Sequence, residues 1–224
     1  MKKTAPSPAG IQSDPAALAR IYARQFCELA ATRRHIFSRL PLRRVGTIFE
    51  PGCGTGLLAG ELTALSDARY TGMDSDSRIL PAGDMFIAGD ALRSLPGADL
   101  YVTSFFFAGV ANPLSWLRRA RRKLSPGGLF AVFAEYDYAA TKIHPDHGIK
   151  EKLLSGLREA GLNTAHGGKL DRFFRYSGFE KIDGGIVRTT SRVPDIEFLT
   201  MYLEELPGPL PQVEWRIVWG IWRK

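Results

Sequence analysis

The chain has 224 residues, of which 45% are hydrophobic and 24% charged, as in an ordinary globular protein. This length suits one domain with a substantial core, and no stretch reaches the roughly 18 consecutive apolar residues of a membrane span. The opening MKKTAPSPAGIQSDP has no apolar segment behind its lysines, so we do not expect a signal peptide. Cys27 and Cys53 are too few for a disulfide framework, which favours the cytoplasm as the location.

The formal net charge of +7 raises the question of a nucleic-acid partner. The densest basic run is LRRARRKL, from Leu117 to Leu124. Leu114, Leu117 and Leu124 recur at helical spacing, which predicts a helix whose arginines lie largely on the opposite, solvated face. No aromatic residues are interleaved with the basic ones, as they are in single-strand binders. The run therefore favours a solvated helix face, with an RNA-binding surface as the alternative.

Strands and helices alternate through the first two thirds of the chain. Apolar residues spaced three and four apart predict one helix over Pro15–Leu40, which begins after Asp14. Further helices are predicted at Thr55–Leu65 and Pro113–Leu124, and strands at Thr47–Glu50, Arg69–Asp74, Met85–Ala88, Leu100–Ser104 and Leu129–Glu135. This alternation predicts an α/β fold with a parallel sheet and helices on both of its faces.

The alternation stops after Glu135, where YDYAATKIHPDHGI indicates a loop. Helices are then predicted at Lys150–Ala160, Leu170–Tyr176 and around Ile196–Glu205, and strands at Phe179–Arg188 and Val213–Trp222. We expect a flexible tail at 1–13 and a single domain at 14–224. Its parts are an N-terminal helix at 14–40, a ligand-binding core at 45–137, a cap at 138–178 and the C-terminal strands at 179–224.

A glycine-rich loop follows the first predicted strand in TIFEPGCGTGLLAGEL, Thr47 to Leu62. Gly52, Gly54 and Gly56 allow positive φ angles and let a ligand approach the backbone closely. Ligands of open α/β sheets bind outside the carboxyl ends of the strands. Asp74 ends the second strand about twenty residues downstream, the distance at which an acid binds ribose hydroxyls.

The same loop discriminates between two classes of ligand. A dinucleotide fingerprint has the pattern G-x-G-x-x-G, but the third place counted from Gly52 is Leu57. Glu50 precedes the loop, and its carboxylate would repel a diphosphate and attract an ammonium or sulfonium. The residues therefore favour a cationic, adenosyl-bearing ligand, and a nicotinamide cofactor is the less favoured alternative.

At these residues the chain resembles the class I S-adenosylmethionine-dependent methyltransferases. FEPGCGTG is similar to the first motif of that family, TGMDSD to the second, IAGDAL to the third and ADLYVTSFFF to the fourth. RRKLSPGGLFAVFAEYD resembles the helix, turn and fifth strand that follow. The resemblance covers about Thr47 to Asp137 and implies a Rossmann-like, seven-stranded sheet with a C-terminal antiparallel strand.

The resemblance also implies the residues that bind the cofactor, S-adenosylmethionine. Glu50 and the loop Gly52, Cys53, Gly54 and Gly56 would face its methionine end. Asp74, with the neighbouring Ser75, would bind the ribose, and Asp90 with Ala91 would read the adenine. Ser104 and Phe105 would lie beneath the sulfonium.

The chain departs from the family pattern after Asp74. Only about ten residues separate it from the next strand, fewer than a crossover helix needs. The adenine would then be more open on that side or covered by another element. We expect the N-terminal helix to be a candidate cover, through Tyr22 or Arg24, with simple packing onto the domain as the alternative.

The methyl acceptor is expected at the loop after the fifth strand, where Glu135, Tyr138 and His144 gather, with His166 further on. A histidine of near-neutral pKa is a candidate general base. The stretch HPDH is too sparse for a metal site, and none is predicted. Ser104-Phe105-Phe106-Phe107 lacks the Asn/Asp-Pro-Pro-aromatic motif of enzymes that methylate base amines and indicates an apolar wall.

The leading hypothesis is therefore methyl transfer to oxygen, nitrogen or carbon of a small molecule. One alternative is an RNA or tRNA methyltransferase, motivated by the positive charge. The other is a member of the fold that binds S-adenosylmethionine without catalysing transfer.

Overall fold

The computed structural model describes residues 14–191, Leu199 and residues 211–224. The described strands form one eight-stranded sheet in the order β3-β2-β1-β4-β5-β8-β6, with β7 also paired to β8. Their bounds are β1 Thr47–Pro51, β2 Arg69–Asp74, β3 Phe86–Ala88, β4 Ala98–Ser104, β5 Leu124–Tyr136, β6 Lys142–His144, β7 Glu180–Ser191 and β8 Gln212–Arg223.

The first five strands are parallel, and β8 runs antiparallel to β5, β6 and β7. Strand order reverses between β1 and β4, as in a doubly wound fold. The predicted fold class is confirmed. The sheet has eight strands instead of seven because Lys142–His144, predicted as loop, pairs with the start of β8.

The helices are α2 Pro15–Glu28, α3 Ala30–Arg39, α4 Leu57–Leu65, α5 Pro113–Lys123, α6 Ile149–Glu159 and α7 Leu170–Tyr176. None of the helices in this part of the chain combines the length and apolarity needed to cross a membrane. The helix predicted around Ile196–Glu205 lies, apart from Leu199, outside the described residues.

The single helix predicted over Pro15–Leu40 was wrong, because the chain turns at Leu29 between α2 and α3. Asp14 caps the start of α2 as expected, since its carboxylate accepts the N–H groups of Ala16 and Ala17. At the other end the Arg33 guanidinium donates to the carbonyl of Phe26 and lies over its ring. An arginine that binds a terminal carbonyl stabilises a helix end, and this one joins α3 to the last turn of α2.

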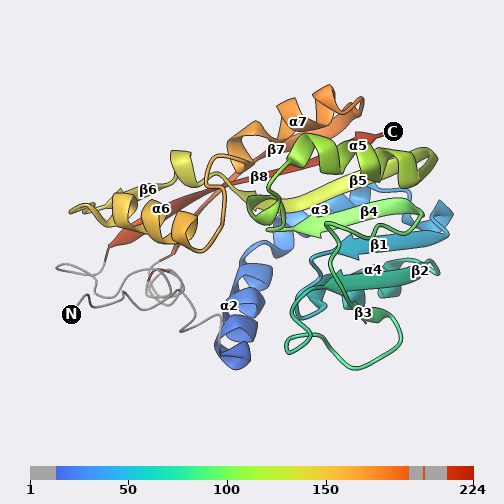
Figure 1. Ribbon diagram of the computed structural model, residues 1–224, viewed down its shortest axis with the longest axis horizontal. Coiled ribbons are helices and arrows are strands. Elements are labelled where there is room, and N and C mark those ends of the chain that lie inside the picture. The colour runs from blue at the N-terminus through green and yellow to red at the C-terminus, as the bar shows by residue number, and fades with distance from the viewer. Residues whose placement is uncertain (1–13, 192–198, 200–210) are drawn as a thin grey trace.

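Two layers of helices cover the sheet, as Figure 1 shows. On one face Trp116 and Leu117 of α5 and Phe174 of α7 pack against Phe130 of β5. On the other face Ile36 of α3 and Leu62 of α4 join a second cluster with strand residues such as Leu100 and Phe133. The alternation of strand side chains between these clusters produces the three-layer fold.

The N-terminal helix α2 does not lie on either face. In Figure 1 it stands beyond the carboxyl ends of β1, β2 and β4. A third cluster forms there from Ile21 and Leu29 with residues from the end of β5, from β8 and from α6. The helix therefore adjoins the edge of the sheet at which ligands of such folds bind.

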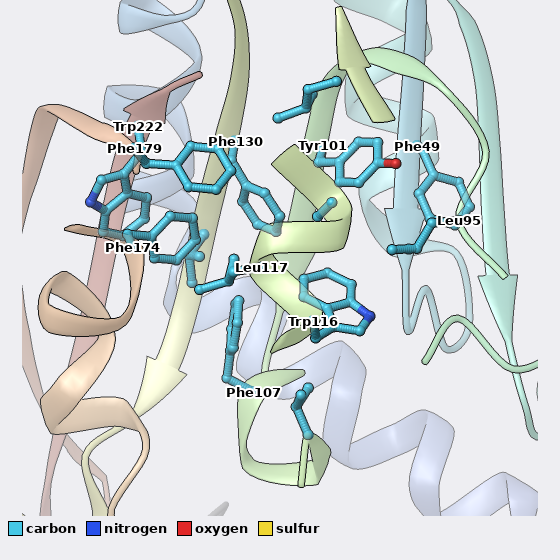
Figure 2. Packing of buried hydrophobic residues seen from close by; sticks show 14 of the residues in the cluster. Phe49, Leu95, Tyr101, Phe107, Trp116, Leu117, Phe130, Phe174, Phe179 and Trp222 are labelled. Atoms are coloured by element: carbon cyan, nitrogen blue, oxygen red, sulfur yellow. The ribbon is translucent and has the colours of Figure 1, made fainter. Parts of the chain in front are cut away.

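The first testable prediction concerns the ring packing of α7 on β8. Phe174 is fully buried, and its ring stacks on Trp222 with centroids 3.8 Å apart (Figure 2). Phe174→Ala should lower the free energy of unfolding by about 3–5 kcal/mol in denaturant titrations. The control Leu65→Ala changes a side chain that is 48% exposed and should stay within about 0.5 kcal/mol of the parent. Equal losses in the two variants would contradict this packing.

Candidate functional site

The glycine loop after β1 is shaped by three left-handed residues. Gly52, Gly54 and Gly56 have φ angles of 68°, 52° and 68°. A Cβ on Gly52 would lie 2.6 Å from the Phe106 ring, and one on Gly56 would lie 2.6 Å from the Phe86 ring. These positions therefore require glycine for backbone conformation and for space.

Asp74 fixes this loop from the end of the neighbouring strand. Its Oδ2 accepts the N–H of Gly54 at 2.8 Å, and its Oδ1 accepts the N–H of Asp76 at 2.9 Å. The carbonyl of Met73 also accepts the N–H of Gly52 at 2.7 Å. A carboxylate offers about four acceptor positions, so these two bonds leave capacity for ligand hydroxyls.

Glu50 is a buried acid at the base of the loop. Its side chain is among the buried groups, and Tyr70 Oη donates a hydrogen bond to its Oε2. Burial raises the pKa of Glu50 to about 8, the Tyr70 hydrogen bond opposes the rise, and the Asp74 carboxylate adds to it. Near neutral pH this site therefore gains most from a ligand that brings positive charge.

Asp90 lies one strand further out, after β3. Its Oδ1 accepts the N–H of Leu92 at 2.8 Å, and its other oxygen pairs with Arg93 at 3.2 Å. The segment between β2 and β3 contains no α-helix, as the short spacing predicted. The carbonyl of Asp74 accepts the N–H of Gly89 at 2.8 Å, which keeps Asp74 and Asp90 at one edge.

The end of β4 carries a strained residue. Phe105 has a φ angle of 53°, and its N–H donates to the carbonyl of Ala134 at 2.7 Å. An aromatic residue in this region costs free energy that the surrounding structure must offset. The result is a ring held beside the ends of β4 and β5, stacked on Tyr136.

These strand ends open into one cavity of about 540 Å³. Of the predicted cofactor residues, Glu50, Gly52, Cys53, Gly54, Asp74, Ser75, Asp90, Ala91, Ser104 and Phe105 line it. Gly56 does not line it; it packs against Phe86 and precedes α4. The volume suits a ligand of drug or cofactor size.

Comparison with known proteins agrees with this geometry. Residues 49–132 match the family model described as a methyltransferase domain. The matched segment contains the glycine loop, Asp74 and Asp90, so this part of the chain is similar to a methyltransferase domain.

Three solved structures show the same fold over nearly the whole chain. An S-adenosylmethionine-dependent methyltransferase from Mesorhizobium loti is 19% identical, covers 87% of this chain and 96% of its own, and has a TM-score of 0.55. A chain from the complex of the Haloferax volcanii Trm112 methyltransferase activator with a methyltransferase is 16% identical. The match covers 91% of this chain and 93% of that one, with a TM-score of 0.61. The plantazolicin methyltransferase BpumL, solved with SAH and a pentazolic desmethylPZN analog, is 16% identical. The match covers 94% of this chain and 93% of that one, with a TM-score of 0.52. No curated protein matches the sequence.

The helix α2 contributes to the same cavity. Tyr22 lines it, and a Cβ on Gly54 would lie 3.4 Å from the Tyr22 ring. Burial raises the pKa of Tyr22 to about 12, with further contributions from the Asp74 and Asp76 carboxylates. Arg24, the other residue expected there, is not among the lining residues.

The residues predicted to act on the acceptor are divided by the structure. Tyr138 lines the cavity, whereas Glu135, His144 and His166 do not. His144 is exposed on β6. His166 is buried with Nδ1 3.0 Å from the carbonyl oxygen of Phe107, so it supports a loop.

Glu135 has a supporting position as well. Its Oε2 accepts the N–H of Phe107 at 2.7 Å, and the side chain is 1% exposed. Burial raises its pKa to about 8, against the lowering effect of the backbone N–H groups of Phe107 and its neighbours. This carboxyl group therefore holds the segment after β4 in place, outside the cavity wall.

Other lining residues were missed from the sequence. Tyr136, Gln25, Ile21 and Leu162 come from three separate segments, and no motif connects them. Tyr136 had one available signal, its position at the carboxyl end of the fifth predicted strand. Across the described residues, no group of three or more His, Cys, Asp or Glu side chains is placed to hold a metal ion.

The second prediction follows from the buried Glu50. With a pKa of about 8 it is mostly protonated at pH 7, and a cationic ligand that binds its anion must release the proton. Affinity for S-adenosylmethionine should therefore rise with pH, by up to about tenfold per unit below pH 8.

Calorimetry at pH 7 in buffers of different ionisation enthalpy measures the released proton directly. The parent protein should release more protons on binding than Glu50→Gln, whose amide cannot ionise. The difference between the two proteins cancels protons that come from the ligand itself. Equal proton release would show that Glu50 does not respond to the cofactor.

Proposed function

We propose that this protein transfers the methyl group of S-adenosylmethionine to a small-molecule acceptor. The observation that carries the proposal is the division of one cavity into two chemically different ends. Glu50, Asp74, Asp76 and Asp90 line its acidic end. Ile21, Phe105, Ala108, Tyr136, Tyr138 and Leu162 line what we call its aromatic end.

The strand order separates these two ends. Asp74 lies at the end of β2 and Tyr136 at the end of β5, with β1 and β4 between them. Neighbouring strands are about 4.8 Å apart, so β2 and β5 are separated by roughly 14 Å. A cofactor at the acidic end and an acceptor at the aromatic end would therefore meet near the ends of β1 and β4.

The acidic side chains of this end suit a cofactor that carries positive charge and ribose hydroxyls. Asp74 would accept ribose hydroxyls, and Asp90 with the Ala91 N–H would bind the adenine edge. Glu50 would stabilise the positive charge of the methionine portion, next to the bare backbone of Gly52 and Gly54. Ser104 and Phe105 would bound the region where the two ends meet, and Tyr22 would cover the loop.

Bound S-adenosylmethionine supplies a methyl group on a positively charged sulfur. Glu50 and the glycine loop would hold the methionine portion, and Phe105 would bound the place of transfer. There an acceptor lone pair would bond to the methyl carbon as the carbon–sulfur bond breaks, the electron pair of that bond would stay on sulfur in a neutral thioether, and an acceptor proton, where there is one, would pass to water. Correct orientation of two bound reactants supplies much of the acceleration in such a displacement.

The chain's own contribution is therefore to hold and align. His144 and His166 lie away from the cavity wall, so the proposal assigns neither a role as general base. Tyr138 is the member of the predicted acceptor set that lines the cavity, so the proposal assigns its ring to the acceptor site.

An RNA acceptor remains the second candidate because of the net charge of +7. Two arginines of the basic run have structural partners, however. Arg119 donates to the carbonyl oxygens of Leu92 and Arg93 at 2.6 and 2.5 Å, and Arg121 donates to that of Gly178 at 2.9 Å. These bonds favour the small-molecule acceptor, because they give the arginines a role within the fold.

The third prediction tests the acidic end. Asp74→Ala removes both the clamp on Gly54 and the proposed ribose acceptor, so affinity for S-adenosylmethionine should fall at least about tenfold. Asp74→Asn keeps one oxygen that can accept a hydrogen bond, so its affinity for S-adenosylmethionine should fall less. The control Asp67→Ala changes an exposed acid near the opposite end of β2 and should bind like the parent. Calorimetry that shows equal affinity for all three variants would contradict the assignment.

The fourth prediction tests the acceptor class. Incubation with isotope-labelled methyl donor should label a compound of the small-molecule fraction of a cell extract, and not its RNA. Label confined to RNA would favour the second candidate, and so would RNA binding that weakens steeply with salt, as phosphate contacts require. Tight donor binding with no label in either fraction would favour a protein that binds the cofactor without transfer.

A further inference from the structure

We propose that the acceptor is a flat, uncharged aromatic molecule with one hydrogen-bonding group, and that it occupies the aromatic end of the cavity. This inference rests on the proposed function, because it assigns the part of the cavity that the cofactor leaves to the acceptor. Four features carry it: the composition of the wall, the orientation of its rings, the partners of its polar groups and the strained residue at its edge.

The wall belongs to a cluster separate from the cores on the two sheet faces. Ile21, Ala108, Tyr136 and Tyr138 are buried members of this cluster, and Phe105 and Leu162 pack against it. The same six side chains line the cavity. An apolar cluster that also faces an open chamber provides surface against which an apolar ligand is stabilised.

The rings of this wall share an approximate orientation. Phe105 and Tyr136 stack with centroids 4.6 Å apart and planes 26° apart. Tyr136 and Tyr138 follow at 5.2 Å and 34°. The first pair is stacked and the second is tilted. A planar ligand can pack its face against such rings more fully than a puckered one.

The polar groups nearby set the position of one heteroatom of the acceptor. Gln25 of α2 lines the cavity, and its Nε2 donates to the Tyr136 hydroxyl at 3.0 Å. A glutamine amide can form up to four hydrogen bonds, so this contact orients the amide and leaves capacity for a ligand. A hydroxyl or amine on the acceptor would be bound there with its ring against the wall.

Charge is disfavoured at this end. The six residues that define it are all uncharged. Arg33 also lines the cavity, but Glu61 binds its guanidinium at 2.8 and 2.9 Å. An ionic ligand would lose hydration at the aromatic end without a charged partner among these six residues, which is costly.

Phe105 connects the wall to the cofactor. It follows Ser104 at the end of β4 and carries the positive φ angle that most side chains avoid. Strained residues persist where the surrounding structure fixes them, and they concentrate at binding sites. The ring of Phe105 therefore marks the boundary across which the methyl group would pass.

The experiment measures binding of three matched probes to the full chain saturated with SAH, by calorimetry. The probes are 2-naphthol, its saturated analogue decahydro-2-naphthol, and naphthalene-2-sulfonate. 2-Naphthol should bind at least about tenfold tighter than either of the others, because only it is both flat and uncharged. Equal affinity for the flat and the saturated alcohol, tighter binding of the sulfonate, or no binding of 2-naphthol would overturn the proposal.

A substitution locates the probe in the chamber. Tyr138→Leu should weaken 2-naphthol by about tenfold while SAH binds within about twofold of the parent, which also shows that the variant is folded. The control Tyr176→Leu removes a ring on α7 that is 51% exposed, and it should change neither the affinity for 2-naphthol nor that for SAH. If both variants lose affinity for 2-naphthol, or if neither does, the probe binds elsewhere. Failure of the parent to bind SAH would instead refute the proposed function.

Discussion

The burial of one carboxyl group beside bare backbone is the constraint on which this site depends. Glu50 lies at the tip of β1 with Tyr70 as its hydrogen-bond donor, and burial keeps its pKa near 8. The glycines that follow it, fixed by Asp74 and Met73, expose backbone to a ligand at the same place. A diphosphate would meet an acid there, whereas a sulfonium or ammonium relieves the cost of ionising it. The local chemistry therefore selects the cofactor class before any contact to its adenosine portion is considered.

The fold brings this chemistry to one edge. Parallel strands place their carboxyl ends together, so residues from β1, β2, β4 and β5 line one cavity although they are far apart in sequence. Helix α2 then covers an edge that the short segment between β2 and β3 leaves without a helix. The bend at Leu29, stabilised by Arg33, lets α3 pack on the sheet while α2 stands over the cavity. The same bend brings Gln25 to the Tyr136 hydroxyl.

The sequence predicted the half of the site that consists of strand ends. Glu50 and Asp74 stand at the ends of strands that hydrophobic patterning identifies, and the glycines follow the first of these strands, so their meeting point follows from the parallel sheet. The acceptor half follows no such rule. Tyr136, Gln25 and Leu162 come from a strand, a helix and a loop, and only the tertiary packing brings them together. His144 and His166 were predicted as general bases because of the usual pKa of histidine. His144 is exposed, however, and the ring of His166 is hydrogen-bonded to the Phe107 carbonyl.

The central claim is that the cavity has a cofactor end and an acceptor end that meet near the tips of β1 and β4. A crystal structure of the chain with SAH tests it most directly. We predict that the adenosine portion lies between Asp74 and Asp90, with the sulfur beside Phe105 and the space against Tyr136 and Tyr138 left for a second molecule. Adenine stacked on Tyr136 and Tyr138, with no contact to Asp74, would contradict it.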